Sequence, residues 1–198
     1  MSVDQKVSKE RILQGAEDIL CSGNYADMTV DALARSLRMS KSTLYKYFPS
    51  KEDVVVALIR EACERAERDL AQIVEQPSAG GQLTALAEVF ERYGERMPRA
   101  LLIESDKVPP ASAARIRHTR EAFAASAIFV VNGGLASGEF GAADAHTVAV
   151  AFVASAEAVL LDGARRGIRG YPARVRQLPD LFLPALRASP GAYSVANT

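Results

Sequence analysis

The sequence predicts an all-α fold. Apolar residues recur at the three- and four-residue spacing of amphipathic helices along almost the whole chain of 198 residues. No stretch shows the sustained apolar–polar alternation of a half-buried strand, and no internal repeat is present. The clearest break is the run PSAGG at residues 77–81, because proline and glycine interrupt helices. We therefore expect helical domains on the two sides of this break.

Three short helices are expected before residue 50. The first is capped by Ser8 and ends near Gly23, since glycine readily takes the left-handed conformation that closes a helix. The second begins at Thr29 and the third at Ser40, because hydroxyl oxygens accept hydrogen bonds from the free N–H groups of a first helical turn. Pro49 ends the third helix. This spacing predicts two short helices joined by a tight turn.

One long helix is expected next. Ser50 and Asp53 resemble a capping box, and the helix that follows reaches about Glu75, long enough to connect two domains. The prediction divides the chain into residues 1–50, a connecting helix over 51–76, a helical domain over 82–188 and a disordered tail over 189–198.

The C-terminal part is expected to be entirely helical. Pro179 and Pro184 predict that its last helix either starts at the first of them or kinks at the second. Four glycines, at positions 133, 134, 138 and 141, predict a loop. The expected helices cover residues 83–97, a short segment within 98–107, 111–135, 144–166 and 175–186.

Positive charge is concentrated in one short stretch. Lysine and arginine together number 24, as do aspartate and glutamate, so the net charge favours no class of partner. Residues 32–51 nevertheless contain five basic side chains and no acidic one. These are Arg35, Arg38, Lys41, Lys46 and Lys51. A short helix carrying Ser, Thr, Lys and Tyr beside such a stretch suits a DNA groove, because phosphates require cations and base edges require small hydrogen-bonding groups.

The sequence offers no metal, cofactor or disulfide site. Cys21 and Cys63 lack the spacing of a zinc or dithiol motif, and His118 and His146 have no ligand-spaced carboxylate or thiol beside them. No Ser-His-Asp order, phosphate-binding glycine loop or catalytic carboxylate pair is present, so we expect no enzyme.

The most apolar window, residues 142–161, contains charged residues and predicts a buried helix, not a membrane span. With no apolar signal region at the N-terminus, a cytoplasmic protein is expected.

Residues 12–53 resemble the N-terminal domain of the TetR family of bacterial repressors. The resemblance rests on an apolar first helix, Tyr25 after a glycine or asparagine, Thr29-Val30-Asp31, and the pattern Ser-x-x-x-Leu-Tyr-x-Tyr-Phe-x-x-Lys from Ser40 to Lys51. Asn24 stands where glycine is commoner in the family. The resemblance implies a ligand-responsive homodimer, most often a repressor, that places its third helix in the major groove of a double-stranded DNA operator.

The positions that match family DNA contacts lie around the expected turn. By their chemistry, residues 41–43 could meet base edges or phosphates, and Lys46 and Lys51 could hold phosphates. Two alternatives stay open: Ser40 is only a cap, or Tyr47 packs under the turn. Arg35 and Arg38 could form a solvated face. The residues that the resemblance assigns to DNA are Thr29, Ser40, Lys41, Ser42, Thr43, Tyr45, Lys46, Tyr47 and Lys51.

The C-terminal domain is similar to the family's ligand-binding and dimerisation domain in helix number and order. The resemblance implies a small-molecule inducer and a dimer interface formed by the last two helices, where small residues such as Ala149, Ala151, Ala154 and Ala158 permit close approach or pack within one subunit. The candidate ligand residues are Phe90, Tyr93, Met97, Leu101, Glu104, Phe123 and Ile128. An ordinary filled core is the alternative for these residues, and solvation is the alternative for Glu104. A protein-binding adaptor that has lost DNA binding is the alternative function.

Overall fold

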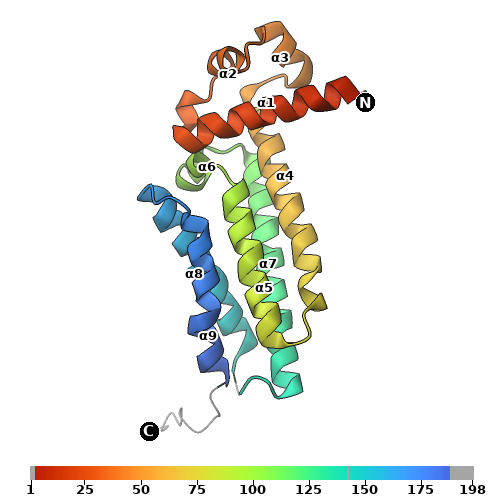
Figure 1. The fold of residues 1–198 in the computed structure, drawn as a ribbon, viewed down its shortest axis with the longest axis vertical. Coiled ribbons are helices and arrows are strands. Elements are labelled where there is room, and N and C mark those ends of the chain that lie inside the picture. Colours follow the sequence, from red (N-terminus) through yellow and green to blue (C-terminus); the bar gives the residue numbers. More distant parts are fainter. Residues whose placement is uncertain (1–2, 142, 188–198) are drawn as a thin grey trace. The chain divides into compact units, whose positions relative to one another are not determined.

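The computed structural model describes residues 3–141 and 143–187, with side chains from residue 9 onward. Its described residues form helices and no strand, so the predicted all-α class is confirmed (Figure 1). The α-helices are α1 (Val3–Ser22), α2 (Val30–Leu37), α3 (Lys41–Tyr47), α4 (Lys51–Ala71), α5 (Ala79–Arg96), α6 (Arg99–Ile103), α7 (Pro110–Ser137), α8 (Ala145–Arg165) and α9 (Leu178–Arg187). The 3-10 helices are η1 (Tyr25–Asp27), η2 (Ile73–Glu75), η3 (Ser105–Lys107) and η4 (Tyr171–Gln177).

Helix boundaries differ from the expected ones at several places. α1 begins at Val3, so Ser8 lies inside the helix and does not cap it. α4 ends at Ala71, before the 3-10 turn η2. The last expected helix is divided into η4 and α9, and Pro179 occupies the first turn of α9, where a missing backbone N–H costs nothing. The predicted tail over 189–198 lies outside the described residues.

The chain folds into two compact units. Unit 1 comprises the residues up to Arg65 together with Gly94–His118, and unit 2 comprises Ala66–Tyr93 together with the residues from Thr119 onward. Helices α4, α5 and α7 contribute residues to both units. This grouping differs from a division at residues 77–81, because that break lies within unit 2.

Unit 1 is built on α1, which packs against α2 and α6 (Figure 1). The apolar face predicted for α1 is buried through Ile12, Ala16 and Leu20, none of which is exposed. Leu44 of α3 and Phe48 after it are also buried, as their pattern requires. This core fixes α3 against α2 and leaves the opposite side of α3 in solvent.

Unit 2 contains two aromatic clusters. The rings of Phe90 and Phe123 stack with their centroids 3.7 Å apart, and Tyr93 meets Phe123 edge-on at 5.7 Å. Phe152 of α8 meets Phe182 of α9 at 5.2 Å. α8 is long and apolar enough to cross a membrane by composition, and 39% of its apolar window is buried inside the protein. The predicted buried helix is therefore buried on one side only.

A carboxylate from a distant loop caps α5. Glu139 accepts hydrogen bonds from the backbone N–H groups of Ala79 (2.7 Å) and Gly80 (2.9 Å), and Arg187 lies 3.4 Å from the same carboxylate. These donors are free N–H groups of the first turn of α5. This cap explains why the helix begins at Ala79, immediately before the two glycines of the run that the sequence marks as a break.

Replacing Glu139 by Gln is expected to lower the free energy of unfolding by about 1 kcal/mol at neutral pH, because one capping oxygen and the charge at the helix N-terminus are lost. Burial raises the pKa of Glu139, but hydrogen bonds from Gly80 and Ala79 and the Arg187 guanidinium outweigh burial and lower it overall. The stabilisation is therefore present above the unfolded value of about 4.3 and lost as pH falls through the folded pKa. Urea unfolding across this pH range should show the variant and the wild type converge in acid, whereas Glu75→Gln, at an exposed site, should match the wild type throughout.

Candidate nucleic-acid interface

The turn between α2 and α3 is closed by a left-handed residue. Arg38 has φ 52° and ψ 41°, and its N–H donates to the carbonyls of Ala34 and Arg35. The N–H of Met39 donates to the Ala34 carbonyl at 3.0 Å. These bonds satisfy the last carbonyls of α2 and set the direction in which α3 departs.

Arg38→Gly is expected to raise the free energy of unfolding by about 0.5–1 kcal/mol. A left-handed conformation costs a non-glycine residue about 1–2 kcal/mol, and the greater chain entropy of glycine offsets part of the gain. Arg35→Gly makes the same chemical change inside α2 and should lower stability by about 1 kcal/mol. Chemical denaturation of both variants measures the difference, and equal signs for the two would show that backbone strain at Arg38 is absent.

The start of α3 is fixed by hydroxyl groups. The Ser40 hydroxyl accepts the Thr43 N–H at 3.1 Å and lies 2.9 Å and 2.8 Å from the hydroxyls of Ser42 and Thr43. Ser40 therefore caps the helix. Thr29 caps α2 in the same way by accepting the Ala32 N–H at 3.0 Å.

The solvent face of α3 carries polar side chains on consecutive turns. Ser42 and Lys46 are exposed, and Tyr45 is 50% exposed although it is aromatic. Thr43 and Tyr47 are half-buried. The face that remains outside the core thus combines a hydroxyl, a phenol and an ammonium group, which are the donors that phosphates and base edges accept.

Two of the expected contact lysines have partners within unit 1. Lys41 forms an exposed ion pair with Asp31, and hydrogen bonding to that carboxylate raises the pKa of Lys41. Lys51 is half-buried: its Nζ donates to the Tyr25 carbonyl at 3.2 Å and lies 4.1 Å from the Tyr25 ring centroid. Sequence reasoning missed both pairings, although Asp31 stands one position outside the acid-free stretch.

The candidate ligand residues are divided between the two units. Phe90, Tyr93, Phe123 and Ile128 belong to unit 2, where the first three form the packed aromatic cluster and Ile128 is half-buried. Met97, Leu101 and Glu104 belong to unit 1, and the first two of these are buried.

Glu104 makes contacts within unit 1. Its carboxylate accepts the Tyr25 N–H at 3.3 Å and pairs with Lys107. The hydrogen bond from Lys107 is the main cause that lowers the pKa of Glu104, and the Tyr25 N–H adds to it. Together with Lys51, Glu104 therefore ties the backbone at Tyr25 to the rest of unit 1, so it is not simply solvated.

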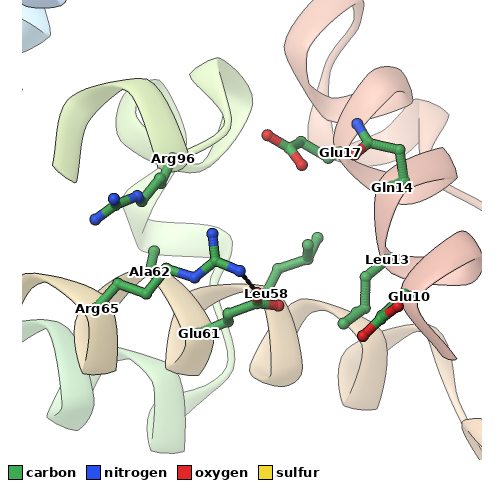
Figure 2. A pocket seen from close by; sticks show the side chains of 9 residues that line it. All are labelled: Glu10, Leu13, Gln14, Glu17, Leu58, Glu61, Ala62, Arg65 and Arg96. Carbon is green, nitrogen blue, oxygen red and sulfur yellow. Dashed lines mark hydrogen bonds and ion pairs between the residues drawn. The ribbon is translucent and has the colours of Figure 1, made fainter. Parts of the chain in front are cut away.

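Unit 1 also contains a cavity of about 250 Å³ that the sequence did not predict (Figure 2). Its walls come from α1, α4 and the end of α5. The residues from α1 and those from α4 each recur at helical spacing, and this spacing is the sequence signal from which the two walls could have been predicted. The lining residues are Glu10, Leu13, Gln14, Glu17, Leu58, Glu61, Ala62, Arg65 and Arg96.

Comparison with known proteins identifies the N-terminal domain. Residues 12–58 match the family model described as bacterial regulatory proteins, tetR family. The transcriptional regulator EthR of Mycobacterium tuberculosis (strain H37Rv) is 39% identical over 87 residues, which cover 42% of this chain and 40% of EthR. The nucleoid occlusion factor SlmA of Marinobacter nauticus is 34% identical over 98 residues, which cover 48% of this chain and 50% of SlmA. The matched segment thus spans half or less of each relative.

Solved structures share the fold over most of the chain. The TetR-family regulator PfmR from Thermus thermophilus superposes with a TM-score of 0.75 at 22% identity, covering 88% of this chain and 97% of PfmR. A putative regulator from Saccharomonospora viridis, solved in complex with choline, gives 0.75 at 21% identity and covers 90% of this chain and 96% of its own. At these identities the likeness concerns the fold alone. Residues 12–58 therefore belong to the tetR family of bacterial regulatory proteins, and the chain as a whole has the fold of TetR-family transcriptional regulators.

Proposed function

We propose that the chain is a homodimeric repressor that binds a near-palindromic operator through α3 and is released by a small molecule bound in its C-terminal domain. The observation that carries the proposal is the exposed face of α3, with Ser42, Tyr45 and Lys46 in solvent and Leu44 anchored in the core. In this proposal, residues 1–50 bind DNA, residues 51–76 connect the two domains, and residues 82–188 bind the ligand and form the dimer.

The proposed DNA contacts differ in how directly they act. Ser42, Tyr45 and Lys46 are exposed and can reach a groove, whereas Lys41 must exchange Asp31 for a phosphate. Lys51 is held by Tyr25, and its proposed contact with phosphate is made from that fixed position. The remaining proposed contact residues form the caps and flanks of α2 and α3, namely Thr29, Ser40, Thr43 and Tyr47.

Binding to random DNA fragments tests the proposal. Selection with the purified protein should enrich a near-palindrome, because a dimer presents two copies of α3 to half-sites roughly 34–36 Å apart. The affinity for the enriched fragment should fall steeply with salt, by about 0.9 in log K per log salt for each neutralised phosphate. Binding without sequence enrichment, or no binding at low salt, would contradict the proposal.

Homodimerisation is supported by an uncovered apolar face on α8 and α9. Val150 is 51% exposed and Leu181 is 69% exposed, so two large aliphatic side chains of these helices face solvent. The small residues Ala151, Ala154 and Ala158 also face solvent, whereas Ala149 is buried within the subunit. A second copy of this face would cover these side chains and let the helices approach closely.

Leu181→Glu is expected to shift the protein from dimer to monomer, since a carboxylate would be placed in an apolar interface without a partner. Sedimentation velocity at several concentrations measures the change. The matched control is Gln177→Glu, an exposed polar position just before α9, which should remain dimeric. A monomeric wild type, or a dimeric Leu181→Glu variant, would rule out this interface.

The proposed inducer acts by changing the spacing between the DNA-binding domains of the two subunits. A coupling free energy of about 1–3 kcal/mol weakens operator binding about 5- to 150-fold. Phe90, Tyr93 and Phe123 are packed ring against ring, so a ligand at this place has to displace at least one ring. Structures that share the fold include the choline complex and the fatty acid degradation regulator FadR of Bacillus halodurans, so the fold by itself favours no single inducer class.

A protein-binding adaptor with the same fold is the second candidate. It is favoured only by the similarity to SlmA, which is a nucleoid occlusion factor. The exposed cations of α2 and α3 favour DNA over a purely protein-binding role, because residues 32–51 contain no anion. Loss of all DNA binding at low salt would favour the adaptor.

A further inference from the structure

The cavity in unit 1 has one wall made of hydrogen-bond acceptors. Glu10, Gln14 and Glu17 lie on one face of α1, because they are spaced four and three residues apart (Figure 2). The amide nitrogen of Gln14 donates to Asp18 at 3.2 Å, so its oxygen remains as an acceptor. A wall of two carboxylates and an amide oxygen is suited to a cationic group.

The opposite wall supplies apolar surface and one satisfied ion pair. Leu58 and Ala62 of α4 are buried beneath the cavity, and Leu13 of α1 adds a third apolar side chain. The guanidinium of Arg65 is bound to Glu61 within α4, as the dashed line in Figure 2 shows. Arg65 is thereby held by its own helix and offsets the charge of Glu17 only in part, while Arg96 at the end of α5 adds a second guanidinium to the lining.

Glu17 is the carboxylate of the cavity that we expect a bound cation to stabilise most. Within the part of the chain whose side chains are described, its carboxylate forms no ion pair, although it is half-buried. Burial is the main cause that raises the pKa of Glu17, and the charges of Asp18 and Glu61 add to it while Arg65 opposes it. Burying a carboxylate without a partner is unfavourable, so a cation at this place would be bound favourably.

We propose that this cavity is a binding site for a small primary aliphatic amine, with the ammonium group on Glu17, Glu10 and Gln14 and the alkyl chain on Leu58 and Ala62. An ammonium has three donors and no acceptor, which matches three acceptors on one helix face. The volume of about 250 Å³ lies below the roughly 300–1,000 Å³ of sites for drug-sized ligands, so the ligand is metabolite-sized. The site lies within unit 1 and is separate from the inducer site proposed for the C-terminal domain.

Calorimetric titration of the DNA-free protein with n-butylamine tests the proposal. Heat of binding is expected for butylammonium and not for 1-butanol or sodium chloride at the same concentration, because the alcohol lacks the charge and sodium lacks the chain. Glu17→Gln keeps the shape of the side chain and removes its charge, and it should weaken butylammonium binding at least about tenfold. The matched control is Glu64→Gln, a partly exposed glutamate of α4 outside the cavity, which should bind like the wild type.

Two results would overturn the amine site. Equal binding by Glu17→Gln and the wild type would mean that the carboxylate does not recognise the amine, and equal heats for butanol and butylammonium would mean that the cavity selects only apolar bulk. The variant removes a half-buried charge that has no ion-pair partner among the described side chains, so it is expected to fold at least as well as the wild type, which a thermal melt checks. DNA is absent from the titration, so its failure would leave the proposed operator binding untouched.

Discussion

Replacing Gly134 by Ala is expected to lower the free energy of unfolding by about 2–3 kcal/mol. A Cβ at this position of α7 would lie 2.1 Å from Cδ2 and 2.5 Å from Cε2 of Phe140. The ring cannot simply move aside, since Phe140 is only 4% exposed and its N–H donates to the Gly134 carbonyl at 3.0 Å. Urea unfolding followed by circular dichroism, at one fixed protein concentration, measures the loss.

The neighbouring glycine provides the control, because the same change is expected to have the opposite sign there. A Cβ on Gly133 would meet nothing within 4 Å, and the residue is exposed within the same helix. Alanine is favoured over glycine in a helix, so Gly133→Ala should raise stability by about 0.5–1 kcal/mol. Stabilisation by both substitutions to the same extent would show that helix propensity and not the Phe140 contact determines the effect.

Arg176→Ala is expected to lower the free energy of unfolding by about 2–3 kcal/mol. Glu91 of α5 is 4% exposed and its carboxylate pairs with the Arg176 guanidinium. Removal of the cation leaves a buried carboxylate without this partner, which is among the costliest single changes in a protein. The estimate is reduced from the value for fully buried pairs because the Arg176 side chain is 62% exposed.

Two further variants separate the ion pair from the loss of a side chain. Arg174→Ala removes an exposed arginine of the same 3-10 helix and should change stability by less than about 0.5 kcal/mol. Adding Glu91→Leu to Arg176→Ala should recover most of the loss, since no buried charge then remains. An Arg176→Ala protein as stable as Arg174→Ala would contradict the role assigned to the pair.

The helices around the turn could be predicted because their signals are local. Thr29 and Ser40 cap α2 and α3 as expected, and Leu44 and Phe48 are buried at the positions that helical spacing gives. Each of these signals involves residues fewer than five positions apart. The local sequence therefore contains all the partners of these interactions.

The errors arise where the partner lies outside the local helical pattern. Gly133 and Gly134 predicted a loop, yet both lie within α7, and Gly134 is small so that Phe140 can pack on the helix. The start of α5 depends on Glu139, which lies 60 residues after Ala79. Helical propensity could not reveal either contact, because Glu139 and Phe140 both lie in the non-helical segment that follows α7.

The candidate interface shows the same difference between local signals and long-range contacts. Exposure of Ser42 and Lys46 follows from the helical period, whereas the engagement of Lys51 with Tyr25 links residues 26 positions apart. Glu104 shows the same limit, since its contact with Tyr25 spans 79 positions. The side chains that are free to meet DNA were therefore easier to predict than those that hold the domain together.

The affinity of Lys46→Ala for the enriched DNA fragment, measured at several salt concentrations beside Arg60→Ala, tests the central claim that α3 contacts DNA. Both residues are exposed cations of unit 1, but Arg60 lies on α4. We expect Lys46→Ala to weaken binding about tenfold and to reduce the salt slope by about 2 for a dimer, one phosphate contact per subunit, while Arg60→Ala should match the wild type. Equal affinities and slopes for the wild type and both variants would show that DNA is bound elsewhere.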